Sequence, residues 1–189
     1  MPLTKTNATY DDLVAVPDRL IAEIIDGNLH VSPHPSAHHC LAQSCLIGVV
    51  GSFSNPPSAP IGGWWILFQP ELHLSDDVLV PDVAGWRRER LPVIPDVPSM
   101  TLPPDWVCEV LTPETEQMDR ADKLRIYRQA GFAHAWLVKL EIGTLEVLRR
   151  ADVGWTLVAA HGGDEAVRAE PFEALEWELR RLWAGLVEP

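Results

Sequence analysis

The stretch DWVCEVLTP, residues 105–113, carries one acid inside a run of apolar side chains. A strand that is covered on both faces has such a near-continuous apolar pattern. Glu109 lies in the middle of it, and a buried carboxylate is costly unless it is protonated, paired or bound to a cation. The stretch therefore predicts a central strand of a sheet and makes Glu109 a candidate functional residue.

A second stretch, VLVPDVAGW at residues 78–86, places Asp82 among apolar neighbours in the same way. Two such strands lying side by side would bring Asp82 and Glu109 together. Close carboxylates repel, and the pKa of one of them rises unless a cation lies between them. Because hard divalent cations take oxygen ligands, often one or two carboxylates plus water and substrate phosphate, we expect Mg²⁺ or Mn²⁺ at this pair.

The residues after the central strand have the pattern of a helix that ends at Ala130, with Gly131 as its stop signal. Lys123 and Tyr127 lie on or near one face of this helix, which a strand–helix connection folds back over the sheet. An ammonium there suits a phosphate or the attacking water of a hydrolysis. The alternative for Lys123 is a surface pair with Asp119, worth about 0.3–0.5 kcal/mol.

The remaining pattern predicts one mixed α+β domain over residues 1–189, with helices flanking a central mixed sheet. A strand–helix–strand crossover lies at its centre, an N-terminal hairpin precedes it, and a C-terminal antiparallel meander follows it. The expected helices cover residues 10–16 and 36–53 and a third stretch that Thr112 or Thr115 would cap and that ends at Ala130. The expected strands cover 21–33 as a hairpin, 64–75, 78–86, 106–111, 134–140, 144–150 and 155–160. A loop covers 54–63, and the pattern of the tail 171–183 is ambiguous, with a strand followed by a helical turn as one interpretation.

Two further groups near the N-terminus are candidates for the same site. Glu23 is an acid on an otherwise apolar strand and would complete the ligand set, whereas strand alternation alone would turn it to solvent. The segment HPSAHH offers three histidines, but no Cys or HExxH accompanies them, so zinc is not expected. His39 is instead a candidate for a contact behind the ligands.

Composition restricts the partners. The formal net charge is −12, which argues against broad non-specific binding to nucleic acid but leaves room for a local contact. Arg87 and Arg88 are candidates for such a phosphate contact, and a solvated face is the alternative. The N-terminus lacks a signal-peptide layout, no apolar run is long enough to span a membrane, and the three cysteines form no CxxC pair, so a cytoplasmic protein is expected.

Four blocks of the chain resemble a known family. AEIIDGNLHVSPHPSAHH, VPDVAGW, WVCEVLTPETEQMDRADKLRIYRQAGFAHAWLV and LEVLRR are similar to successive blocks of the Uma2 family, also called DUF820. This family belongs to the restriction-endonuclease-like PD-(D/E)XK superfamily of nucleases. The resemblance covers about residues 10 to 185 and implies the fold of that superfamily.

The resemblance also implies roles for single residues. Asp82 and Glu109 match the metal-binding acids of the superfamily. The usual motif has a lysine two residues after the glutamate, where this chain has Leu111, so Lys123 on the following helix would supply the ammonium group. Glu23 matches the N-terminal acid of the family. His39 matches the family's histidine at the start of the first long helix.

These observations predict a Mg²⁺- or Mn²⁺-dependent phosphodiester hydrolase, with DNA as the expected substrate. Two alternatives stay open at this point. The acidic net charge favours a catalytically silent binding or assembly module on the same fold. A metal-dependent hydrolase of a small phosphorylated substrate would need no basic footprint. A homodimer is the commonest assembly among soluble oligomers and is the assembly to expect if the chain associates.

Overall fold

A central sheet of six strands organises the computed structural model, which describes residues 5–55 and 62–185. Positions 56–61 of the predicted loop lie outside the described residues. The strand order is β11-β10-β9-β8-β7-β4, and only β8 and β9 run parallel. The bounds are β4 Trp64–Phe68, β7 Val83–Arg87, β8 Trp106–Leu111, β9 His134–Lys139, β10 Thr144–Arg150 and β11 Trp155–Gly162.

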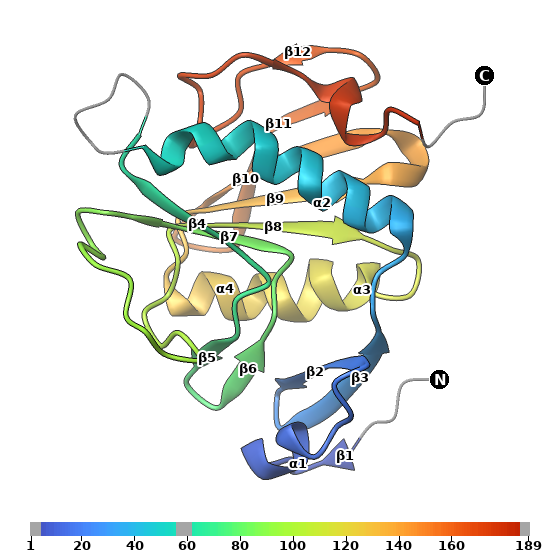
Figure 1. Ribbon diagram of the computed structural model, residues 1–189, viewed down its shortest axis with the longest axis vertical. Coiled ribbons are helices and arrows are strands. Elements are labelled where there is room, and N and C mark those ends of the chain that lie inside the picture. Colours follow the sequence, from blue (N-terminus) through green and yellow to red (C-terminus); the bar gives the residue numbers. More distant parts are fainter. Residues whose placement is uncertain (1–4, 56–61, 186–189) are drawn as a thin grey trace.

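Helices cover both faces of this sheet (Figure 1). The long helix α2 (Ala37–Val50) packs on one face, and it begins where Ser36 accepts a hydrogen bond from the His39 backbone N–H. The crossover between β8 and β9 packs on the other face as α3 (Glu116–Met118), the π-helical turn η2 (Asp119–Lys123) and α4 (Leu124–Ala130). The predicted crossover and the mixed α+β class are confirmed.

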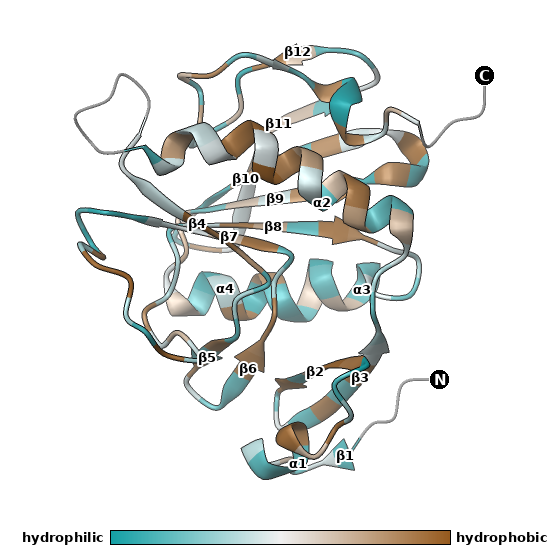
Figure 2. Ribbon diagram, in the orientation of Figure 1, coloured by the Kyte–Doolittle hydropathy of each residue, from teal (hydrophilic) through white to brown (hydrophobic). Residues whose placement is uncertain are grey.

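The alternation of side chains along β8 explains why this strand is central. All six of its residues are buried. Trp106, Cys108 and Val110 enter the core beneath α2, whereas Val107 and Leu111 enter the core beneath α4. The strand is hydrophobic along most of its length in Figure 2. Because strand side chains alternate between faces, Glu109 points to the α4 side, as Leu111 does.

A second sheet forms the N-terminal part of the molecule, in the order β1-β3-β2-β6-β5. The predicted hairpin is present, and Asp26 and Gly27 take the positive φ values that its two-residue turn requires. The bounds are β1 Lys5–Thr6, α1 Tyr10–Val14, β2 Leu20–Ile25, β3 Asn28–Pro33, β5 Leu72–Leu74 and β6 Asp77–Leu79.

Two predicted elements differ from the structure. The strand expected over residues 78–86 is divided, because β6 ends at Leu79 in the second sheet and β7 begins at Val83 in the central sheet. Pro81 has no backbone N–H and cannot continue a ladder, so the chain changes sheets there. Asp82 therefore lies immediately before β7 and not within a strand. The strand expected over 64–75 is divided in the same way between β4 and β5.

The C-terminal elements complete the core on the α2 side. β10 and β11 form the predicted meander with β9. The tail adds the short pair β12 (Ala166–Val167) and β13 (Trp177–Glu178), and then the 3₁₀ turn η4 (Leu179–Leu182); two further 3₁₀ turns are η1 (Gly51–Ser54) and η3 (Leu140–Ile142). Among the helices of residues 5–55 and 62–185, none has the length and apolar character needed to cross a bilayer.

Candidate active site

Asp82 and Glu109 meet where the ladder between β7 and β8 ends. The last paired residues are Val83 and Cys108. Beyond them, the Asp82 backbone N–H donates to Glu109 Oε2 at 3.3 Å, and the Val110 N–H donates to Asp82 Oδ2 at 2.6 Å. The two carboxylates thus accept the hydrogen bonds that backbone carbonyls would otherwise accept. The Asp82 N–H therefore holds the carboxylate of Glu109, and the N–H of Val110, the residue after Glu109, holds the carboxylate of Asp82.

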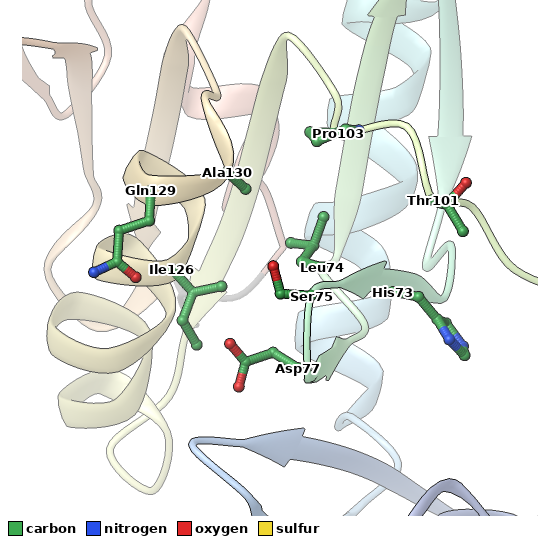
Figure 3. Close-up of a pocket in the computed structure, with 9 residues that line it drawn as sticks. All are labelled: His73, Leu74, Ser75, Asp77, Thr101, Pro103, Ile126, Gln129 and Ala130. Carbon is green, nitrogen blue, oxygen red and sulfur yellow. The ribbon is translucent and has the colours of Figure 1, made fainter.

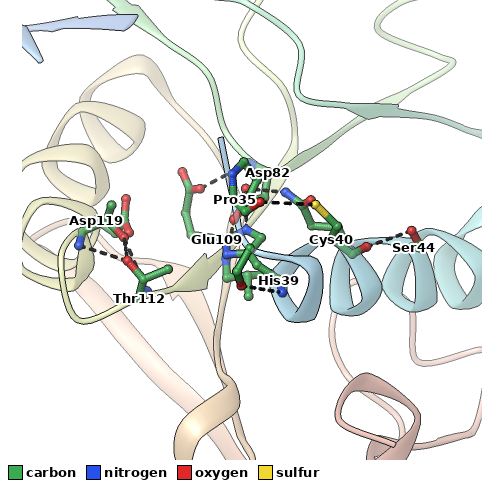
Figure 4. Close-up of polar contacts among 12 residues, drawn as sticks. Pro35, His39, Cys40, Ser44, Asp82, Glu109, Thr112 and Asp119 are labelled. Carbon is green, nitrogen blue, oxygen red and sulfur yellow. Dashed lines mark hydrogen bonds and ion pairs between the residues drawn. The ribbon is translucent and has the colours of Figure 1, made fainter. Parts of the chain in front are cut away.

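The first long helix holds the other oxygen of Asp82. His39 Nε2 and Gln43 Nε2 both donate to Asp82 Oδ1, at 3.0 Å and 2.6 Å. Figure 4 shows Asp82 and Glu109 between α2, which carries His39, and the helical segment that carries Asp119. A carboxylate accepts about four hydrogen bonds, two at each oxygen. With Oδ1 filled and one donor at Oδ2, Asp82 keeps one open lone pair, on Oδ2.

Glu109 is held in a similar way from the opposite helix. Its Oε1 accepts a hydrogen bond from the Tyr127 hydroxyl and lies 2.9 Å from Lys123 Nζ. Its Oε2 accepts the Asp82 N–H. The same count leaves one open lone pair on Glu109 Oε2. Asp82 Oδ2 and Glu109 Oε2 are therefore the two atoms that remain free to bind a cation.

Lys123 is the cation at the centre of a buried acid cluster, which comprises Glu23, Asp82, Glu109, Asp119 and Lys123. Its Nζ lies 2.9 Å from Glu109 Oε1, 3.1 Å from Glu23 Oε1 and 3.6 Å from Asp119 Oδ1. Its side chain is 4% exposed. Across the described part of the chain, these three carboxylates have no ion pair with any other Lys or Arg. The cluster therefore holds more acids than its ammonium neutralises.

The π-helical turn η2 explains how one helix supplies three buried polar groups to this cluster. Asp119, Lys123 and Tyr127 are each four residues apart and are all buried. In an α-helix of 3.6 residues per turn, residues four apart are rotated by about 40°, so the third would turn away from the first. A π-helical turn holds more residues per turn and reduces this rotation. Lys123 and Tyr127 therefore both contact Glu109, and Asp119 lies beside Lys123.

The excess of acids changes the pKa values in the cluster. Burial raises the pKa of Glu109 to about 8; Lys123 opposes this shift, and Asp119 and Asp82 add to it. Burial also raises the pKa of Asp119. Burial would lower the pKa of Lys123, but the attraction of Glu109 and Glu23 outweighs it and raises that pKa well above its ordinary value. A proton or a bound cation is needed to balance the cluster near neutral pH.

The donor set fits a hard divalent cation. Both open lone pairs are carboxylate oxygens, and Mg²⁺ is commonly bound by one or two carboxylates with water and substrate phosphate as its other ligands. Within residues 5–55 and 62–185, no three or more His, Cys, Asp or Glu side chains form a ready-made metal cage. An Mg²⁺ site with two carboxylate ligands and several water ligands is consistent with the two open lone pairs and with the lack of a ready-made cage.

The structure gathers most of the predicted residues at one place. Glu23 of β2, which also accepts a hydrogen bond from the Val80 N–H at 2.8 Å, lies in the cluster and does not face solvent. The gathered residues are Glu23, His39, Asp82, Glu109, Lys123 and Tyr127. Asp82 is the most exposed acid of the cluster, at 13%, so solvent approaches the acids from its side.

Arg87 and Arg88 lie elsewhere. They are at the far end of β7, about five residues or roughly 16 Å of extended chain from Asp82. The Arg88 guanidinium stacks 3.6 Å from the Trp65 ring centroid and donates to the carbonyls of Trp64 and Ser54. Arg87 lies 4.6 Å from the Trp64 ring centroid. The predicted phosphate contacts are therefore not next to the two acids.

Two polar residues of the site were not predicted to act there. Gln43 is fully buried and donates to Asp82, and Asp119, expected only as a surface partner, is buried beside Lys123. A signal for Gln43 exists in the sequence, because it follows His39 by four residues on an otherwise apolar helix face. Asp119 has no comparable signal, because its burial depends on the π-helical turn η2.

A cavity of about 360 Å³ lies between the β5–β6 hairpin and α4. Figure 3 shows Ser75 and Asp77 on its hairpin side and Ile126 and Gln129 on its helix side. None of its lining residues belongs to the acid cluster. The cavity therefore adds nothing to the candidate site.

Comparisons with known proteins identify a family and a similar fold. The Uma2 family, described as "Putative restriction endonuclease", matches residues 8–181. A crystal structure described as a putative nuclease belonging to DUF820, from Anabaena variabilis, is 21% identical and has a TM-score of 0.76; the match covers 95% of this chain and 99% of that one. At this identity the likeness shows a shared fold. A search of curated proteins found no match.

Proposed function

The chain belongs to the Uma2 family, and we propose that it is a Mg²⁺- or Mn²⁺-dependent endonuclease that hydrolyses phosphodiester bonds of DNA. The description of the family as restriction endonucleases supports a nuclease. The observation that carries the proposal is the pair of carboxylates at the end of the β7–β8 ladder. Asp82 Oδ2 and Glu109 Oε2 each keep an open lone pair there, next to a buried ammonium.

The proposed roles follow from these contacts. Asp82 and Glu109 would hold the ion, which when bound stabilises charge on the phosphate and lowers the pKa of a bound water. Tyr127 and Lys123 fix Glu109 so that only Oε2 remains open. Glu23 completes the buried acids and keeps Lys123 charged.

Lys123 acts first as a fixed positive charge. An ammonium has three N–H donors, and three carboxylates surround this one. Glu109 Oε1 and Glu23 Oε1 lie within hydrogen-bond distance of its Nζ, whereas Asp119 Oδ1, at 3.6 Å, lies beyond that distance. The third N–H is therefore the one that we expect to contact a water or a phosphate oxygen. The position of its charge beside Glu109 then favours the negative charge that develops on the phosphate.

A hydrolase of small phosphorylated substrates is the second candidate. The net charge of −12 and the engagement of Arg87 and Arg88 with aromatic rings favour it, because neither provides a footprint for a DNA backbone. The same acids would bind the ion in both cases. Parallel assays on plasmid DNA and on a small phosphodiester such as bis-p-nitrophenyl phosphate distinguish the two candidates.

The direct test is nicking of supercoiled plasmid with Mg²⁺ or Mn²⁺ and with EDTA. We expect metal-dependent nicking by the wild-type protein and background activity for Asp82→Asn and Glu109→Gln. Asp77→Asn is a matched control, because Asp77 is a partly buried acid that also accepts a backbone N–H but lies outside the cluster. Cleavage that persists in both variants, or in EDTA, would contradict the proposal.

A further inference from the structure

The side-chain amide of Gln43 forms a hydrogen bond through its nitrogen and none through its oxygen among the described residues. Gln43 lies on α2, is 0% exposed, and donates from Nε2 to Asp82 Oδ1 at 2.6 Å. Its Oε1 is buried and has no partner among the described residues. A buried amide oxygen without a partner is unfavourable, so packing alone does not account for a glutamine here. The hydrogen bond that Gln43 donates to Asp82 explains why a glutamine lies at this position.

His39 repeats this arrangement one turn earlier. Its Nε2 donates to the same oxygen, Asp82 Oδ1, at 3.0 Å, and its Nδ1 is buried without a partner among the described residues. Ser36 fixes the start of α2 by accepting the His39 backbone N–H at 3.3 Å. The helix therefore presents two donors to one carboxylate oxygen, and Oδ2 receives only the Val110 N–H.

This asymmetry determines how Asp82 can bind a cation. With both lone pairs of Oδ1 occupied, Asp82 can ligate only through Oδ2, as a monodentate ligand. Mg²⁺ demands near-ideal octahedral geometry, whereas Ca²⁺ takes six to eight oxygens and accepts bidentate carboxylates. A carboxylate held in the monodentate form favours the smaller ion.

We propose that Gln43 is a positioning residue that, together with His39, occupies Asp82 Oδ1 and so makes the site select Mg²⁺ or Mn²⁺ over Ca²⁺. This inference rests on the proposed metal site at Asp82 and Glu109. Gln43 contacts neither the ion nor the phosphate. It acts through Asp82, and its effect is on the relative affinity for two cations.

The test is competition of Mg²⁺ or Ca²⁺ against Mn²⁺, followed by the electron paramagnetic resonance signal of free Mn²⁺. Gln43→Met keeps the length of the side chain and removes the donor. Loss of a partner that orients a ligand typically weakens metal binding by about 10- to 100-fold. We expect a loss of this size for Mg²⁺ and a smaller loss for Ca²⁺, so that the Mg²⁺/Ca²⁺ affinity ratio falls about 10-fold.

Leu46→Ala is the matched control, because Leu46 is also fully buried on α2 but does not contact Asp82. It should lower the thermal unfolding midpoint and leave the affinity ratio unchanged. An unchanged ratio in Gln43→Met, with wild-type metal binding intact, would overturn this inference alone. Absence of metal binding by the wild-type protein would overturn the proposed function and this inference with it.

A folding failure is also decisive. If Gln43→Met does not fold, Gln43→Leu tests the same loss of the donor with a different apolar shape, and the affinity ratio of that variant decides the inference. If neither variant folds, the contribution of Gln43 is to the fold, and the inference is rejected.

Discussion

Two ion clusters on consecutive turns of one helical segment differ in charge balance. In the surface cluster, Arg120 binds Glu146 through two nitrogens and Glu116 through Nε, and Lys139 also binds Glu116. Two cations thus face two carboxylates, with side chains 25–33% exposed. Such a cluster is complete as it stands and requires nothing else to bind.

The buried acid cluster, three residues further on, is not balanced. Lys123 alone faces Glu23, Glu109 and Asp119, and Asp82 lies beside them. Burial makes this excess costly, as the raised pKa of Glu109 shows. A cluster of acids therefore indicates a functional site when it is both buried and short of cations.

Removal of the central cation should have the largest effect on this contrast. We expect Lys123→Met to destabilise the protein by about 3–5 kcal/mol near pH 8, because it leaves buried carboxylates without their partner. The loss should be smaller near pH 5, where Glu109, whose pKa is raised to about 8, is protonated. Urea unfolding at the two pH values measures both quantities.

Arg120→Met is the matched control for that variant. It removes a long cation from the next-turn surface cluster, and exposed pairs contribute about 0.2–1 kcal/mol. Equal losses of stability from Lys123→Met and Arg120→Met would show that the two clusters are energetically alike. That result would remove the basis for treating the buried acid cluster as the functional one.

The next largest effect concerns pH. A metal bound by Glu109 must displace the proton that its raised pKa of about 8 retains. The ionised fraction of Glu109 rises from about 1% at pH 6 to about one half at pH 8, so apparent metal affinity should rise about 50-fold over this range. Calorimetric titration with Mn²⁺ at pH 6, 7 and 8 measures the rise.

The same pKa has a consequence for the metal-free protein. An acid whose pKa is raised on folding binds its proton more tightly in the folded state. Its contribution to stability therefore declines as pH rises from its ordinary pKa of 4.5 through about 8. Added metal should offset this decline, so it should raise the unfolding midpoint more at pH 8 than at pH 6. Metal affinity that does not change with pH would contradict the assignment of Glu109 as a ligand.

Most of the fold could be predicted because local patterns and burial agree. The apolar run around Glu109 identified the central strand, and the Asp26-Gly27 turn identified the hairpin. The sequence did not predict that the chain passes from the second sheet to the central sheet at Pro81. A proline inside an apolar run is compatible with either an edge strand or a break, and only the positions of the neighbouring strands decide between them.

The site was predictable in its acids but not in its geometry. An acid in an apolar strand is visible in a sequence, so Asp82 and Glu109 could be singled out. The burial of Asp119 could not, because it depends on a π-helical turn that spacing in an α-helix does not suggest. Arg87 and Arg88 show the reverse case. Their charge suggested a phosphate contact, whereas stacking on Trp64 and Trp65 depends on strand pairing that the charge does not indicate.

The smallest predicted effect comes from Tyr127→Phe, which changes the pKa of an acid in the buried acid cluster without removing a charge. The Tyr127 hydroxyl donates to Glu109 Oε1 and thereby lowers the pKa of this acid relative to burial alone. Because such a bond contributes about 1 kcal/mol, Tyr127→Phe should raise that pKa further, by roughly half a unit to one unit. The pH at which Mn²⁺ affinity reaches half of its maximum should move upward by the same amount.

Glu116→Gln is the control for this shift. It removes a carboxylate that binds Arg120 and Lys139 in the surface cluster and that makes no ion pair with Lys123. We expect it to leave the pH dependence of Mn²⁺ binding in place. A shift of equal size in Glu116→Gln, or no shift in Tyr127→Phe, would mean that the proton released on metal binding does not come from Glu109. The excess of acids in the buried acid cluster would then be balanced by a different group, and Asp119, whose pKa is also raised, would be the first to test.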